Sequence, residues 1–312
     1  MRKARNAGFL MPLSSNTARL SMLVLAICGM SSLAHATNYS LWINGRTSTP
    51  GNVNSPADFT YWGGAPTLGV QAGINPISVN WDGKSHVSTT NAGIQKALDC
   101  YCTGSNWCYV AVHSAGNLQI GYALSKYGNS VRNSAAVPTD GVCTGAVGGA
   151  KQTGWNIKFV DEGAGAAGGS ELADSGAWST SEELVQDLKT TTARAMYDHN
   201  LTRNVNFYMY AGAKGAVTSA VLKGQNDSVV AYHSTGGTSG TSGRRLCNPG
   251  QSSLTCPYDL TMGTAANEDG SKKWSFHSVV FRDDAEAFDH YVNQNWAGTM
   301  SKVRTHMVNT AK

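Results

Sequence analysis

The sequence predicts an α/β protein with a mostly parallel central sheet flanked by helices. Short apolar runs rich in β-branched and aromatic residues alternate with segments whose apolar residues recur at helical spacing. This alternation is typical of parallel strands joined by crossover helices. The runs expected to be strands are residues 39–43, 77–81, 107–113, 155–160 and 205–211. The segments expected to be helices are residues 90–99, 117–127, 181–198 and 296–310, and the glycine- and serine-rich stretches 163–169 and 234–243 are expected to be loops, either surface connections or walls of a cleft.

The N-terminal residues 1–36 have the pattern of an export signal. Basic residues precede a short apolar core at residues 20–30, and Ala34-His35-Ala36 forms a small-residue cleavage site. The apolar core is too short to span a bilayer. We therefore expect residues 1–36 to be removed, leaving one domain at residues 37–312 without a transmembrane segment.

Removal of this segment changes the charge balance. The full chain has 24 basic and 20 acidic residues. Four of the basic residues and none of the acidic ones lie in residues 1–36, which leaves 20 of each sign. Nucleic acid and anionic membranes both require a concentrated basic surface. The composition therefore gives no reason to expect either partner, and we expect an exported protein, secreted or periplasmic.

The cysteine count fits an oxidising compartment. Six of the seven cysteines remain after removal of the signal, and an even number in an exported chain suggests three disulfides. Cys247 and Cys256 enclose a short loop, so we expect them to form one of these bonds. A zinc cluster is the alternative, but the three closely spaced cysteines have no matching close pair elsewhere, so no metal is expected. The pairing of the other four stays open: Cys100, Cys102, Cys108 and Cys143.

The seventh cysteine, Cys28, lies within the predicted signal. A lipid-anchored cysteine at this position is a competing interpretation of the N-terminus. Ile27 before it is bulky, where such sites prefer a small residue. The pattern therefore favours cleavage after Ala36.

The most informative segment is residues 107–117, where an apolar run ends at a serine between small residues and then becomes helix-like. A strand that turns sharply at Ser114 into a helix would lift the hydroxyl clear of the sheet. The next amide, that of Ala115, would then lie beside a developing oxyanion. Ala115 and Gly116 are small enough for this turn, but Val112 stands where the G-x-S-x-G pattern has its first glycine. The segment predicts a nucleophile elbow.

A serine hydroxyl needs a histidine to take its proton and usually a carboxylate to orient that histidine. In an elbow hydrolase the acid and then the histidine follow the serine in the chain. Asp227 is the candidate acid, and an ordinary role in its own turn is the alternative. We expect His290 to be the base because it lies in a connector, from which a side chain can reach the elbow. His277, within a strand-like run, is the alternative base.

The other histidines are expected to be structural. His113 adjoins the serine, but neighbouring side chains on a strand point to opposite faces. We therefore expect His113 to pack or to form hydrogen bonds rather than to act as the base. The same structural role is expected of His86, His199, His233 and His306.

An oxyanion also needs a second donor, from a loop that follows an early strand. Residues 41–46 supply that loop, since Gly45 allows close backbone approach and Arg46 would donate its amide. A simple strand-ending turn is the alternative. The aromatic residues Trp42, Tyr61 and Trp62 are candidates for an apolar acyl site, although aromatic residues are more often part of the core.

In this order the residues resemble the α/β-hydrolase superfamily, in its secreted lipase and esterase branch, over nearly all of residues 37–312. Each of the similar segments carries one part of the expected site. In the oxyanion segment, Asn44 stands where the family has a histidine. Residues 112–116 look like the lipase box, 44–45 like the oxyanion segment, 164–174 like the loop after the next strand, 224–230 like the acid loop and 289–291 like the histidine turn before the closing helix.

The resemblance implies a secreted serine hydrolase that cleaves small or polymeric carboxylic esters through an acyl-enzyme. Ser114 would attack, His290 would transfer the proton and Asp227 would orient the imidazole. This chemistry needs no metal or organic cofactor. An amidase or peptidase would use the same groups, and a binding protein on a hydrolase fold would keep the architecture without the chemistry. The residues do not separate these alternatives.

Overall fold

The structure is a computed structural model of the 312-residue chain. Residues 1–35 of the predicted signal, Cys143, Cys247, Cys256 and the stretch 237–243 lie outside the residues that it describes. The described residues are 36–64, 73–134, 150–178, 181–212, 221–222, 226–236, 263–266, 273–281, 290 and 299–311.

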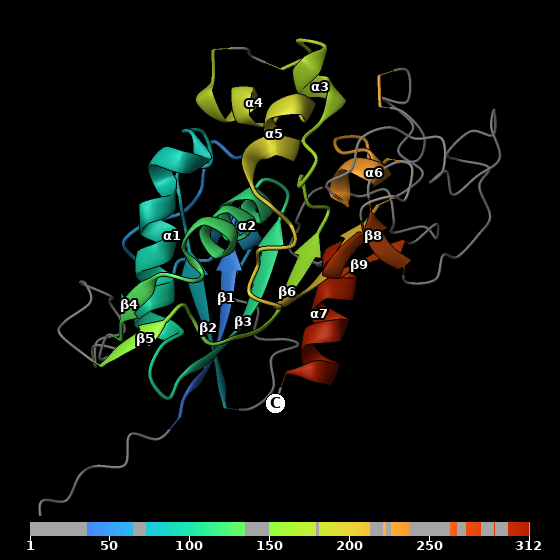
Figure 1. Cartoon of the computed structure of the whole chain (residues 1–312). Coiled ribbons are helices and arrows are strands. Elements are labelled where there is room, and N and C mark those ends of the chain that lie inside the picture. Colours follow the sequence, from blue (N-terminus) through green and yellow to red (C-terminus); the bar gives the residue numbers. More distant parts are fainter. Residues whose placement is uncertain are drawn as a thin grey trace, which may run out of the picture. The chain divides into compact units, whose positions relative to one another are not determined.

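A seven-stranded sheet forms the centre of the fold (Figure 1). Its strands lie in the order β2-β1-β3-β6-β7-β9-β8, and all neighbours are parallel except the antiparallel pair β8 and β9. The predicted mostly parallel sheet is confirmed, and the five expected strands are all present. The strands are β1 (Asn38–Ile43), β2 (Ile74–Val79), β3 (Trp107–His113), β6 (Ile157–Gly163), β7 (Asn206–Ala211), β8 (Gly263–Ala266) and β9 (Lys273–Phe281).

Helices cover both faces of this sheet. Successive residues of a strand point to opposite faces, and in β1 Leu41 enters one hydrophobic cluster while Trp42 enters another. The first cluster includes residues of α1 (Val87–Tyr101) and α2 (Gly116–Tyr127), and the second includes residues of α7 (Thr299–Thr310). A parallel sheet buried on both faces explains why its strands are nearly continuous apolar runs in the sequence.

Shorter elements complete the described residues. None of the described helices has the length and apolar character needed to cross a bilayer. The remaining elements are η1 (Thr60–Trp62), the antiparallel pair β4 (Val131–Asn133) and β5 (Lys151–Thr153), α3 (Glu171–Asp174), α4 (Glu183–Asp187), α5 (Thr190–Met196) and α6 (Tyr232–Thr235).

The single helix expected over residues 181–198 is instead two short helices, α4 and α5. Lys189 between them is extended, with ψ of 135°. Asp174 stabilises this break because its carboxylate accepts hydrogen bonds from the backbone amide (3.0 Å) and the hydroxyl (2.7 Å) of Thr190. An acceptor outside the segment thus favours a new helix start at Thr190, which the apolar spacing within residues 181–198 does not reveal.

A disulfide between Cys102 and Cys108 joins the end of α1 to the start of β3. Cys100 is also disulfide-bonded. Disulfide bonding among the closely spaced cysteines thus agrees with the expectation of an oxidising compartment. The expected bond between Cys247 and Cys256 lies outside the described residues.

The close packing at the start of α2 leads to a prediction about stability. A methyl group on Gly116 would lie 2.6 Å from the carbonyl oxygen of Ile43 and 2.8 Å from that of Asn44. Because both neighbours are backbone atoms, we expect Gly116→Ala to lower the free energy of unfolding by about 1–3 kcal/mol. Urea denaturation of the two proteins measures this difference.

The matched control is Gly93→Ala in α1. A methyl group there meets nothing within 4 Å. Alanine is the better helix former, so this control is expected to raise the free energy of unfolding by up to about 1 kcal/mol. Equal effects of the two substitutions would contradict the proposed steric restriction at Gly116.

Candidate active site

The turn between β3 and α2 places Ser114 at the carboxyl end of a central strand. Ser114 has φ of 53°, in the left-handed region that residues other than glycine rarely adopt. Its amide donates to the carbonyl of Gly163 on β6 (3.2 Å), and its carbonyl accepts from the amide of Ala166 (3.1 Å). These bonds fix the strained turn from a neighbouring segment. The strand, sharp turn and helix predicted around Ser114 are therefore present.

Val112, which replaces the first glycine of the motif, fits the sheet without disturbing this turn. It is fully buried in the cluster under α1 and α2 and stays in register with Ile43 and Glu162 on the adjacent strands. The steric restriction lies instead at Gly116, where backbone carbonyls leave no room for a side chain. The departure from the motif at Val112 therefore leaves the turn intact.

The structure brings Ser114, His290 and Asp227 together from three separate segments. The Nε2 atom of His290 lies 3.2 Å from the Ser114 hydroxyl oxygen, and its Nδ1 atom lies 2.6 Å from Oδ2 of Asp227. All three residues are buried. A hydroxyl, an imidazole and a carboxylate thus form one hydrogen-bonded chain in the order that nucleophilic catalysis requires.

Asp227 is held by its own turn as well as by the histidine. Its Oδ1 atom accepts from the amides of Val229 (2.9 Å) and Val230 (2.7 Å), and its own amide donates to the carbonyl of Val230 (3.2 Å). This arrangement leaves Oδ2 directed at His290. The turn role and the triad position, which were alternatives in the sequence, are both present in one residue.

His277 does not reach the elbow. It lies in β9, buried, with its ring stacked on Phe207 at 4.4 Å between centroids and an interplanar angle of 6°. Burial lowers the pKa of His277 to about 3, so its imidazole is neutral at physiological pH. The alternative base of the sequence analysis is therefore a core histidine.

The loop after β1 packs against the elbow. A Cβ atom on Gly45 would lie 2.6 Å from Cβ of Ser114 and 2.8 Å from the carbonyl oxygen of His113, so only glycine permits this approach. Arg46 follows it and lines the same pocket as Ser114. No backbone carbonyl among the described residues accepts from the amide of Arg46 or from that of Ala115.

Asn44 holds this loop in place. It is fully buried, its Nδ2 atom donates to the carbonyl of Trp81 (3.1 Å) and its Oδ1 atom accepts from the Trp81 amide (3.0 Å). The indole of Trp81 donates in turn to the carbonyl of Asn44 (2.6 Å). Three hydrogen bonds thus fasten the loop to the segment after β2. The asparagine that replaces the oxyanion-segment histidine has a clear structural role.

Ser114 and His290 open into a pocket of about 370 Å³. The loop at residues 163–169 is buried and contributes Ala166 to the pocket, as the cleft-wall interpretation of this stretch predicted. Hydroxyl-bearing and apolar side chains both line it. The hydroxyls belong to Thr47, Ser48, Thr49 and Thr60, and the apolar group is Ala166, Trp178, Leu188, Val229 and Val230.

The three aromatic residues proposed for an acyl site have different places in the structure. Trp42 and Trp62 are fully buried in the hydrophobic cluster beneath α7, and their rings meet edge to face at 5.4 Å. Tyr61 lines the pocket. Of the three, only Tyr61 is therefore in a position to contact a ligand in this pocket.

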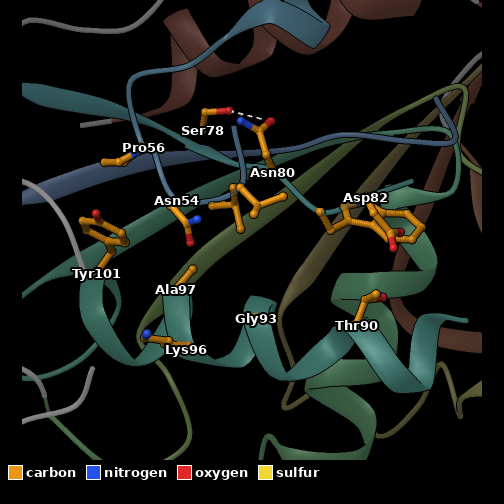
Figure 2. Close-up of a pocket in the computed structure, with 13 residues that line it drawn as sticks. Asn54, Pro56, Ser78, Asn80, Asp82, Thr90, Gly93, Lys96, Ala97 and Tyr101 are labelled. Carbon is orange, nitrogen blue, oxygen red and sulfur yellow. Dashed lines mark hydrogen bonds between the residues drawn. The ribbon is translucent and has the colours of Figure 1, made fainter. Parts of the chain in front are cut away.

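A second, larger hollow has a volume of about 710 Å³ (Figure 2). Lys96 and Tyr101 of α1 form one side of it, and Asn54 and Pro56 come from the loop before η1. None of the three residues of the hydrogen-bonded chain lines this hollow. The candidate site is therefore the smaller pocket, where the polar groups converge.

A buried carboxyl group lies behind the elbow. Glu162 of β6 is fully buried, and its Oε2 atom accepts from the side-chain amide of Asn117, the residue whose backbone amide donates to the Ser114 carbonyl (3.2 Å). Burial raises the pKa of Glu162 well above its ordinary value, and the Asn117 hydrogen bond opposes this only in part. Two successive acids at the end of an apolar strand, Asp161 and Glu162, were the signal in the sequence that could have revealed this group.

The described residues hold no group of three or more histidine, cysteine or acidic side chains placed to bind a metal ion.

Comparison with known proteins adds weak structural similarity. No protein-family model and no curated protein matches the sequence. A metagenomic carboxyl esterase is similar at 16% identity over 65% of this chain and 60% of that chain, with a TM-score of 0.44. The mature form of a Bacillus licheniformis lipase is similar at 12% identity over 64% of this chain and 80% of that chain, with a TM-score of 0.39. The propeptide form of the same lipase is similar at 12% identity over 78% of this chain and 47% of that chain, with a TM-score of 0.40.

All of these TM-scores are below 0.5, and the strand order and the elbow define the fold. A parallel sheet covered by helices on both faces carries Ser114 on a strand-to-helix turn, and the acid and histidine follow in the chain. This is an α/β-hydrolase fold. In this hydrolase fold the carboxyl ends of β1 and β3 lie side by side, which explains why Gly45 meets the elbow.

The buried carboxyl of the hydrolase fold leads to a prediction about pH. In the unfolded chain Glu162 titrates near its ordinary pKa, whereas in the folded chain its pKa is raised. The contribution of Glu162 to the free energy of unfolding is therefore complete at low pH. It decreases as the pH rises through the ordinary pKa toward the raised pKa of the folded chain. We expect Glu162→Gln, which cannot ionise, to be more stable than the parent protein at pH 8 and to lose this advantage near pH 4.

Urea denaturation at both pH values measures the difference. The matched control is Glu183→Gln, which removes an exposed carboxylate and is expected to change the stability by less than about 0.5 kcal/mol. A Glu162→Gln protein whose stability changes with pH as steeply as that of the parent would show that Glu162 is ionised in the folded state.

Proposed function

We propose that this protein is a serine hydrolase that cleaves carboxylic esters, with Ser114, His290 and Asp227 as its catalytic triad. The observation that carries the proposal is the hydrogen-bonded chain from Ser114 through His290 to Asp227 at the mouth of a pocket. The three residues come from segments far apart in the sequence, and His290 is 176 residues from Ser114. A structural core has no need for such an arrangement next to a strained serine.

The hydrogen bonds define the proton positions. A carboxylate only accepts, so Asp227 keeps the proton of neutral His290 on Nδ1. The lone pair on Nε2 is then directed at the Ser114 hydroxyl. This tautomer allows His290 to act as a general base toward the serine without any rearrangement.

The proposed reaction forms and breaks bonds in two stages. The Ser114 oxygen attacks the ester carbonyl carbon as its proton moves to Nε2 of His290, and the oxyanion accepts from the amides of Ala115 and Arg46. His290 then gives the proton to the departing alcohol, which leaves an acyl-enzyme. Water then attacks the acyl carbon as its proton moves to Nε2 of His290. His290 returns this proton to the Ser114 oxygen as the carboxylic acid leaves.

The choice of an ester over an amide rests on the resemblance of the elbow, acid and histidine segments to those of lipases and esterases. An amidase or peptidase would use the same nucleophile, base and donors. Hydrolysis of ester and amide substrates with the same acyl group separates the two, and a clear preference for the amide would overturn the ester assignment.

The test of the nucleophile is Ser114→Ala. Removal of the attacking oxygen is expected to lower kcat for ester hydrolysis by about 10⁴-fold or more. A fluorophosphonate probe is expected to label Ser114 in the parent protein, as found by peptide mass analysis, and to leave the variant unlabelled.

Ser78→Ala is the matched control, because Ser78 is a buried serine on β2 that lines the larger hollow. This control is expected to keep both hydrolysis and labelling. Ester hydrolysis that persists in pure Ser114→Ala protein would overturn the proposed function. A folded, disulfide-bonded parent protein that neither reacts with the probe nor hydrolyses esters would favour a binding protein on a hydrolase fold.

We also propose that the protein is exported and that residues 1–36 are removed. Protein recovered from the periplasm or the medium is then expected to begin at Thr37, which the intact mass measures. A mature protein that keeps residues 1–36, or that carries lipid on Cys28, would contradict this proposal.

A further inference from the structure

A second series of hydrogen bonds reaches His290 at its backbone, from the partly buried Tyr61 through the buried His113. The hydroxyl of Tyr61 is hydrogen-bonded to Nδ1 of His113, and Nε2 of His113 is hydrogen-bonded to the backbone carbonyl of His290. The ring centroids are 5.7 Å apart for Tyr61 and His113 and 5.0 Å apart for His113 and His290. This chain therefore contacts the backbone of His290, while its imidazole contacts Ser114 and Asp227.

The direction of each proton in this chain follows from its partners. A carbonyl only accepts, so Nε2 of His113 must be the donor. Burial lowers the pKa of His113 to about 3, so its imidazole is neutral and carries a single N–H. Nδ1 is then an acceptor, and the Tyr61 hydroxyl must donate to it. Burial raises the pKa of Tyr61 and so keeps this proton on the phenol.

The same chain extends to the loop after β1. The phenol oxygen of Tyr61 accepts from the backbone amide of Gly45, which precedes Arg46. Trp62 packs edge to face against both rings, with centroids 5.1 Å from Tyr61 and 6.4 Å from His113. The hydrogen bonds thus lie in an apolar surrounding, where they are stronger than in water.

The hydrogen bond from His113 adds a contact at the backbone of His290 to the two contacts that its imidazole makes. A general base must stay within hydrogen-bond reach of its nucleophile, and a displacement of about 1 Å can cost roughly 100-fold in rate. His113 directly precedes Ser114 on the strand. The hydrogen bond from His113 to His290 therefore links the backbone of the base directly to the residue before the nucleophile.

We propose that Tyr61 and His113 are positioning residues, which hold the backbone of His290 and the loop at Gly45 in one fixed arrangement around Ser114. This inference rests on the proposed function. Neither side chain takes part in the transfer of protons to or from the substrate. Their effect is on how often Ser114, His290 and the oxyanion donors are in line at the same time.

Three substitutions test the chain step by step. His113→Leu removes both hydrogen bonds, Tyr61→Phe removes only the donor to Nδ1, and His113→Gln keeps an N–H near the position of Nε2. We expect His113→Leu to lower kcat for ester hydrolysis by roughly 10- to 100-fold with KM unchanged within about twofold, because alignment and not substrate binding is lost. His113→Gln is expected to recover most of this loss, and Tyr61→Phe to lie between the two.

Tyr39→Phe is the matched control. It removes the hydroxyl of Tyr39, a buried residue at the opposite end of β1, where this hydroxyl bonds to Thr37. We expect its kcat to equal that of the parent protein. Thermal unfolding of each variant shows whether it folds, and if His113→Leu does not fold, Tyr61→Phe and His113→Gln carry the test.

A second readout does not depend on activity. Nitrogen-15 NMR of the histidines in Ser114→Ala protein is expected to show His113 as the neutral tautomer with its proton on Nε2. A proton on Nδ1, or no loss of kcat in folded His113→Leu and Tyr61→Phe proteins, would overturn the inference. So would an equal loss of kcat in His113→Gln and His113→Leu.

The failure of this inference can be told apart from the failure of the proposed function. Ester hydrolysis that survives Ser114→Ala removes the proposed function itself. Hydrolysis that is abolished by Ser114→Ala but unchanged in the His113 and Tyr61 variants removes only their role as positioning residues.

Discussion

The left-handed turn at Ser114 is the constraint on which the rest of the site depends. A serine with φ of 53° is strained, and the structure keeps it there through backbone hydrogen bonds to Gly163 and Ala166. The turn also brings its own backbone so close to the loop after β1 that Gly45 and Gly116 have no space for a side chain. The glycines are therefore consequences of the turn, and the turn places Ser114 at the pocket.

Burial of polar groups sets the second requirement of the site. A buried polar group is costly unless it is hydrogen-bonded, and here the bonds are arranged so that each group has one orientation. Asp227 is held by two backbone amides, His290 by Asp227 through its ring and by His113 through its backbone. The same bonds that offset the cost of burial thus leave Nε2 of His290 facing the serine.

Much of the fold could be predicted from local pattern, because a sheet buried on both faces requires continuous apolar strands. The five strands were found within a few residues of their bounds. The elbow at Ser114 could be placed because an apolar strand ends there in a serine followed by small residues, and Gly116 indeed has no room for a side chain. The prediction of one continuous helix over residues 181–198 was wrong. The Asp174 carboxylate accepts a hydrogen bond from Thr190 where the second of the two short helices begins, and these residues come close together only in the folded chain.

The succession of strands along the chain, the strained turn and the chain order of Ser114, Asp227 and His290 could all be read from the amino-acid sequence, since they depend on backbone sterics and side-chain chemistry over a few residues. Folding in three dimensions was needed to show that His290 and not His277 meets Ser114, and that His113 bonds to the backbone of His290. The physical reason is that a hydrogen bond acts over about 3 Å in space, while the residues that form these bonds are separated by more than a hundred positions in the chain.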